Sequence, residues 1–176
     1  MPASRRVVFA ERLEAGPLLW DGAMGTQLYE RSGLQADQCL EEMNSMDSEL
    51  VKSVHLDYIR AGAQVIETNT FGANSLRLAA YGLADRVVEI NRAGVKIARA
   101  AQTLTGQSVW IAGAVGPLGQ GLAPLGSVKQ AHARQAFTAQ VRALSDAGVD
   151  LLTLETFTDL REIQEAISAC REVCDL

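Results

Sequence analysis

The chain is poor in cysteine, proline and aromatic residues, and it has no long hydrophobic run. Among its 176 residues are three cysteines and four prolines, and aromatic residues make up 5%. An odd number of cysteines without regular spacing excludes a disulfide scaffold and predicts a cytoplasmic protein. The longest apolar runs are too short to cross a bilayer, so no membrane partner is expected. The net charge of −5 argues against a nucleic-acid partner.

What the chain does contain is an alternation of short apolar segments and longer amphipathic ones. A hydrophobic fraction of 48% suffices for a core, and 176 residues predict one domain. Each short segment is bounded by glycine or polar residues, as strands are, and strands alternating with helices predict an α/β fold with parallel strands. The predicted strands are residues 18–21, 65–68, 109–115 and 151–155, and the predicted helices are residues 48–61, 84–104, 128–147 and 159–173.

The strand ends recur at intervals of 40 to 48 residues, which gives four βα units. Two units also share a pattern, in which Ala-Gly precedes an apolar run that ends on Glu67-Thr68 or on Glu155-Thr156. A closed (β/α)8 barrel needs eight such units. The spacing therefore leaves two alternatives, a small open sheet or the first half of a (β/α)8 barrel.

Acidic residues stand at the carboxyl ends of three predicted strands: Asp21, Glu67 and Glu155. That edge of a parallel sheet is where ligands bind. A carboxylate cluster there suits a cation, either a metal ion or the ammonium group of an amino acid, and a Mg²⁺-dependent enzyme with these three ligands is one hypothesis. The alternatives are structural: Asp21 can cap the next turn, and Glu67 can pair with a basic side chain.

Five segments, in this order and spacing, resemble homocysteine S-methyltransferases: LLWDGAMGTQLY, IETNTFGANSLRL, EINRAGVKIAR, IAGAVGPLG and LLTLETFTDL. The resemblance runs from about residue 18 to the end of the chain. It is strongest to the amino-terminal domain of bifunctional homocysteine S-methyltransferase/methylenetetrahydrofolate reductases.

The resemblance implies a zinc-binding (β/α)8 barrel that transfers a methyl group to the homocysteine sulfur and so makes methionine. It implies that Asp21 and Glu155 hold the substrate ammonium and that backbone N–H groups around Gly22 hold its carboxylate. Asn69 and Thr70 are expected to line the pocket. The implied partners are homocysteine and a methyl donor, with methylfolate favoured by the likeness to the folate-linked enzymes.

The sequence departs from the family pattern at the zinc ligands. In the family these are cysteines of the second half of the barrel, in an Asn-Cys segment and a Gly-Gly-Cys-Cys-Gly segment, and neither segment is present. Cys39, Cys170 and Cys174 lie in the wrong units to replace them. The sequence thus predicts a partial homocysteine-binding domain, residues 1–176, that ends after the fourth βα unit, holds no metal or catalytic residue and is inactive alone. A second hypothesis is a non-catalytic half-barrel module that self-associates through exposed strand edges.

Overall fold

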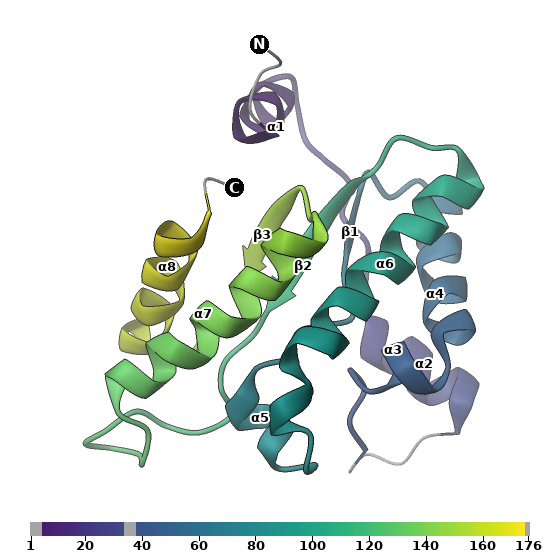
Figure 1. Cartoon of the computed structure of the whole chain (residues 1–176). Coiled ribbons are helices and arrows are strands. Elements are labelled where there is room, and N and C mark those ends of the chain that lie inside the picture. Colours follow the sequence, from purple (N-terminus) through teal and green to yellow (C-terminus); the bar gives the residue numbers. More distant parts are fainter. Residues whose placement is uncertain (1–4, 34–37, 175–176) are drawn as a thin grey trace.

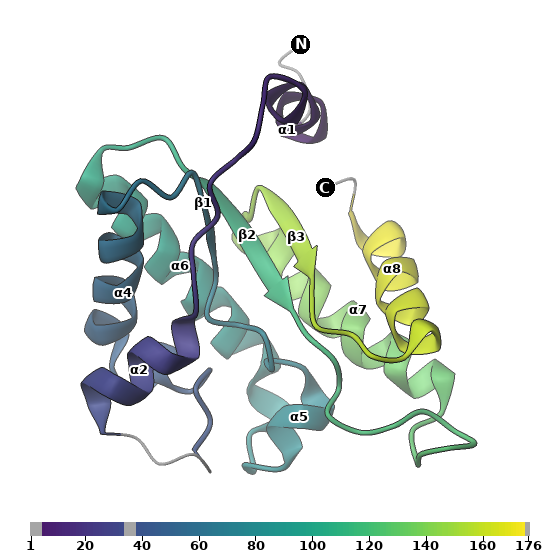
Figure 2. The ribbon, with the colours of Figure 1, turned by 180° about the vertical axis from the view of Figure 1, so that it is seen from behind.

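The computed structural model describes residues 5–33 and 38–174, so both ends of the predicted domain 1–176 lie outside the described residues. Helices α4, α6, α7 and α8 lie side by side on one face of a small sheet (Figures 1 and 2). The strands are β1 (Val65–Glu67), β2 (Trp110–Val115) and β3 (Leu151–Leu154); the helices are α1 (Arg5–Glu14), α2 (Met24–Ser32), α3 (Met43–Met46), α4 (Ser48–Arg60), α5 (Ser75–Ala79), the 3-10 helix η1 (Ala84–Arg86), α6 (Val87–Thr105), α7 (Gln130–Ala147) and α8 (Leu160–Val173).

The strands are parallel and lie in the order β1-β2-β3. Glu67 of β1 is paired with Ala112 of β2, and Val115 of β2 with Leu154 of β3. The α/β class with parallel strands is therefore confirmed. Three of the predicted strands are present as strands, and the four predicted helices are present as α4, α6, α7 and α8.

The predicted strand at residues 18–21 forms only one parallel bridge, between Trp20 and Val65. Its ladder begins normally, because Val65 donates its N–H to Leu19 O and Asp21 donates its N–H to Val65 O. The next N–H, that of Glu67, donates instead to the carboxylate of Asp21 at 2.9 Å. The side chain of Asp21 thus takes the place of a backbone carbonyl, so the pairing between residues 18–21 and β1 ends at Asp21.

The main core lies between the sheet and its helices, and Phe137 of α7 is fully buried in it. The opposite face of the sheet is covered near the amino ends of the strands, where Phe9 of α1 packs edge-on against Trp110 at 5.2 Å between ring centroids. Helix α1 lies beyond the amino ends of the strands (Figure 2). Within the described parts of the chain, no helix has the length and apolar character needed to cross a membrane.

His55 of α4 is completely buried, and neither ring nitrogen has a hydrogen-bond partner in the described structure. Burial lowers the pKa of His55 from 6.5 to about 4. The unfolded chain binds this proton more readily, so the pH-dependent cost of His55 is absent well above pH 6.5 and grows as the pH falls toward 4.

Replacing His55 with methionine is expected to reduce the loss of unfolding free energy between pH 7 and pH 5 by about 2 kcal/mol. Methionine fills a similar volume and takes up no proton. Urea denaturation at both pH values measures the effect, and His132→Met, at an exposed position of α7, is the control. An equal pH dependence in wild type and His55→Met would contradict the assignment.

Candidate functional site

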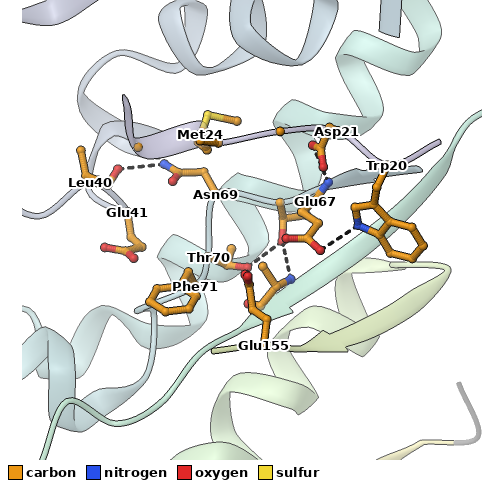
Figure 3. Close-up of a pocket in the computed structure, with 15 residues that line it drawn as sticks. Trp20, Asp21, Met24, Leu40, Glu41, Glu67, Asn69, Thr70, Phe71 and Glu155 are labelled. Carbon is orange, nitrogen blue, oxygen red and sulfur yellow. Dashed lines mark hydrogen bonds between the residues drawn. The ribbon is translucent and has the colours of Figure 1, made fainter. Parts of the chain in front are cut away.

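A cavity of about 480 Å³ opens at the carboxyl ends of the strands. Its walls come from the segment between the predicted first strand and α2, from the loop after β1, and from the ends of β2 and β3 (Figure 3). The lining residues are residues 20–25, residues 67–71, Leu40, Glu41, Ala114 and Glu155. The sheet edge at which the sequence predicts a ligand is thus hollow.

The floor of the cavity follows from strand register. Side chains alternate across a sheet, so Glu67 in β1 and Glu155 just after β3 face the same side as Ala112 and Ala114 of the central strand. Alanine is the smallest residue with a Cβ, so Ala114, which lines the cavity, leaves room between the flanking strands. The two glutamates of the flanking strands therefore face the same cavity.

The three predicted acids meet in this cavity (Figure 3). Glu67 Oε1 accepts the indole N–H of Trp20 at 2.8 Å, and the Glu67 and Glu155 side chains line the same cavity. Asp21 accepts the backbone N–H of Glu67, while α2 has Ala23 as its N-cap with no side-chain cap. The structural alternative for Asp21, capping of the next helix, is therefore wrong.

The cavity is lined by several acidic side chains although it is partly shielded from solvent. Burial raises the pKa of Asp21 to about 7, and the charges of Glu67 and Glu155 push it in the same direction. Burial, followed by the charge of Glu67, raises the pKa of Glu155 to about 7. Among the described residues, no lysine, arginine or histidine lines the cavity. A cation from outside would relieve the repulsion among these acids.

The wall beside the acids is the amino end of α2. The helix begins at Met24, and its N-cap residue Ala23 supplies no side-chain acceptor for the free N–H groups of the first turn. Such a helix end attracts an anionic group. Gly22, just before this helix end, packs against Tyr58, because a Cβ at position 22 would lie 2.9 Å from Tyr58 Oη. The cavity therefore has an acidic end and an N–H end next to each other.

Asn69 and Thr70 also line the cavity, but their polar atoms hold the wall together. The Asn69 amide donates to Leu40 O at 2.8 Å and to Asn44 Oδ1 at 3.1 Å. The Thr70 hydroxyl donates to Ala114 O at 2.8 Å, and Gln140 Nε2 of α7 donates to Thr70 O at 2.7 Å. These bonds fix the loop after β1, from which Glu67 and Phe71 extend.

Three site residues escape the sequence argument: Trp20, Glu41 and Thr156. Glu41 accepts the N–H of Gly72 at 2.6 Å and so ties its segment to the loop after β1. Thr156, the residue after Glu155, adopts the left-handed region at φ 61°, which is rare for a β-branched residue. In the sequence, only the repeated Glu-Thr pair pointed toward Thr156. Contacts between distant segments, such as that of Glu41, leave no local sequence pattern.

The cysteines do not fit a zinc site in this chain. Cys39 is buried and donates to Glu41 Oε2 at 3.4 Å, and Cys170 and Cys174 lie at the end of α8 against the helix core. Burial raises the pKa of Cys39 to about 12 and that of Cys170 to about 11, which disfavours the thiolates that bind zinc. Across the described positions, no three His, Cys, Asp or Glu side chains form a group that could hold a metal ion.

Fold and site together define an α/β protein with a ligand cavity at the carboxyl edge of its parallel strands. A family model described as homocysteine S-methyltransferase matches residues 18–175, and the chain belongs to this family.

Named relatives agree with this membership. The chain is 34% identical over 173 residues to a methionine synthase of Mycobacterium tuberculosis, with 93% of this chain and 14% of the relative covered. It is 36% identical over 162 residues to the homocysteine S-methyltransferase of Escherichia coli, with 84% and 52% covered. The metallated homocysteine methyltransferase MmuM of Escherichia coli superimposes with a TM-score of 0.78 at 30% identity, over 92% of this chain and 62% of that one. The chain thus spans 14% to 62% of the length of these relatives.

Proposed function

We propose that this chain is the homocysteine-holding part of a homocysteine S-methyltransferase, and that it supplies the first four βα units of a (β/α)8 barrel. The proposal rests on family membership and, above all, on one observation: three carboxyl groups and an uncapped helix end face the same cavity. The whole protein would transfer a methyl group from a donor such as methylfolate to homocysteine and give methionine.

In this proposal the two poles of the cavity recognise the two charges of an α-amino acid. Asp21 and Glu155 accept hydrogen bonds from the ammonium group, and the N–H groups that follow Gly22 bind the carboxylate. The aliphatic part of homocysteine lies toward Met24, Leu40 and Phe71, the apolar side chains of the lining. The chain thereby fixes the direction in which the homocysteine side chain, with its terminal thiol, extends from the α-carbon.

Zinc, where the family binds it, makes the homocysteine thiol a thiolate that can attack the methyl group. The cysteines of this chain do not fit that ion, so no step of the reaction is assigned to them. The residues described here bind and orient the substrate. Sulfur activation is proposed to depend on residues of the whole protein beyond this chain.

The proposal predicts that the purified chain binds L-homocysteine and L-methionine but transfers no methyl group, with or without added zinc. Isothermal titration calorimetry measures the binding. 4-Mercaptobutyrate, which lacks the ammonium group, and homocysteamine, which lacks the carboxylate, are each expected to bind at least tenfold more weakly, because each leaves one pole of the cavity unmatched. Equal affinity for all four compounds would refute the two-pole site.

The self-association of the half-barrel hypothesis stays a prediction. In the described structure β3 pairs only with β2, so its outer edge has no strand neighbour there. The magnesium hypothesis also stays a prediction. Among the described side chains, no group of three His, Cys, Asp or Glu residues is placed to hold a metal ion.

A further inference from the structure

Two consecutive residues, Trp20 and Asp21, hold Glu67 at two different points. The indole N–H of Trp20 donates to Glu67 Oε1 at 2.8 Å, and the backbone N–H of Glu67 donates to Asp21 Oδ2 at 2.9 Å. Figure 3 draws both bonds as dashed lines that meet at Glu67. The side chain and the backbone of this glutamate are therefore both tied to the segment before α2.

The Trp20 ring is itself held in place. It is half-buried and packs against the buried cluster of Val65, Ala112 and Leu151. The Trp20 backbone also forms the single parallel bridge to Val65. A tryptophan side chain has only two rotatable bonds, so few contacts suffice to fix its ring. The indole N–H is thus a rigid donor directed at one oxygen of Glu67.

The place of this hydrogen bond gives it a role beyond satisfying the indole. A half-buried indole N–H usually finds some acceptor. Here the acceptor is an acid that lines the cavity together with Asp21 and Glu155, at the end where the ammonium group is proposed to bind. The indole N–H can only donate, so it fixes Oε1 of the carboxyl group and leaves Oε2 for a ligand.

We propose that Trp20 is a positioning residue of the amino-acid site, and that Glu67, which it orients, is the third acceptor for the ammonium group. This inference rests on the proposed function, which assigns Asp21 and Glu155 to that group. An ammonium group has three N–H donors, so two acids leave one donor without a partner. Glu67 Oε2 accepts the third N–H, because the indole already occupies Oε1.

The consequence is that the effect of the indole depends on the group it orients. In Glu67→Gln the indole N–H still selects the oxygen of the side chain, so the amide nitrogen takes the place of Oε2. That nitrogen is a donor and repels the ammonium N–H groups. When the indole is removed as well, the amide is free to turn its oxygen toward the ligand. Loss of the indole should therefore weaken binding in wild type and strengthen it in Glu67→Gln.

Affinities for L-methionine, measured by calorimetry, test this reversal of sign. Trp20→Phe is expected to bind about tenfold more weakly than wild type, whereas Trp20→Phe/Glu67→Gln should bind roughly fivefold more tightly than Glu67→Gln. Trp110→Phe is the matched control, because Trp110 packs against the same buried cluster, and its affinity should equal that of wild type. A purely structural tryptophan would weaken both backgrounds alike, and that result, or no effect in either, would overturn the inference.

A second measurement keeps Trp20 in place. The chain has two tryptophans, so ¹⁵N labelling gives two indole N–H signals in an NMR spectrum, and Trp110→Phe identifies that of Trp20. Saturating L-methionine is expected to shift the Trp20 signal, because its ammonium group shares the Glu67 carboxyl group with the indole. Saturating 4-(methylthio)butyrate, which lacks the ammonium group, should shift it far less.

The two measurements separate this inference from the function on which it rests. If wild type binds L-methionine but the sign does not reverse, or if both ligands shift the Trp20 signal equally, the positioning role is wrong and the proposed function stands. If wild type binds no L-methionine at all, the proposed function is refuted and the inference with it.

Discussion

Asp21→Asn is expected to weaken the binding of homocysteine and methionine about a hundredfold, because a desolvated charge partner of the ammonium group is lost. The substitution preserves the local structure, since the asparagine oxygen can still accept the backbone N–H of Glu67. The loss of affinity therefore measures the effect of the Asp21 charge alone, because the hydrogen bond that ends the first strand is kept. Affinities of the two amino acids at pH 8 measure the effect.

The same substitution is expected to stabilise the ligand-free fold. The pKa of Asp21 is raised from 3.8 to about 7, so its contribution to stability is complete below pH 3.8 and is lost as the pH rises through 7. Asparagine removes that loss, so the variant should gain on wild type between pH 4 and pH 8. Asp146→Asn, at an exposed and distant position of α7, serves as control. Unchanged affinity, or lower stability than wild type at pH 8, would contradict the role of Asp21.

Gly94→Ala is expected to destabilise the chain by about 3 kcal/mol, although glycine to alanine inside a helix normally stabilises by up to about 1 kcal/mol. A Cβ on Gly94 of α6 would lie 2.7 Å from Thr70 Cγ2 and 2.9 Å from Asn44 Nδ2. Asn44 is buried and donates to Asn69 O at 2.8 Å. The added methyl group would therefore displace Asn44 and Thr70 and weaken the hydrogen bonds that hold the loop after β1.

Urea denaturation measures this cost, and the double variant Gly94→Ala/Thr70→Ser supplies the control. Serine keeps the hydroxyl that donates to Ala114 O but lacks the methyl group in the clash. It should restore part of the lost stability. A Gly94→Ala protein as stable as wild type would show that α6 and the loop after β1 are not tightly packed.

Much of the fold was predictable because it rests on local patterns. The apolar stripes of α4, α6, α7 and α8 and the apolar runs of the three strands are read directly from the sequence. The predicted strand at residues 18–21 shrank to one bridge because of a side-chain contact to Glu67, which no local pattern encodes. The helices α1, α2, α3 and α5 were not predicted: α3 and α5 are too short to show a period, and α2 starts inside an apparent glycine turn.

The candidate site divides in the same way. That Asp21, Glu67 and Glu155 meet was predictable, since strand ends of a parallel sheet share one edge. That the Trp20 indole fixes Glu67, or that Asn69 supports a wall, depends on which distant segments come together. The chemistry of single residues is visible in a sequence, whereas their hydrogen-bond partners depend on tertiary structure.

The bond from the Gln140 amide to Thr70 O also bears on how the site is assembled in time. It joins residues 70 positions apart and is buried between α7 and the loop after β1. Contacts over so long a separation form late in folding, because closing the chain between them costs entropy before the bond contributes. The loop that carries Asn69 and Phe71 therefore gains this bond only when α7 docks against it. During synthesis, Glu67 of β1 and the loop after it would emerge long before α7, which supplies the bond from Gln140 to that loop.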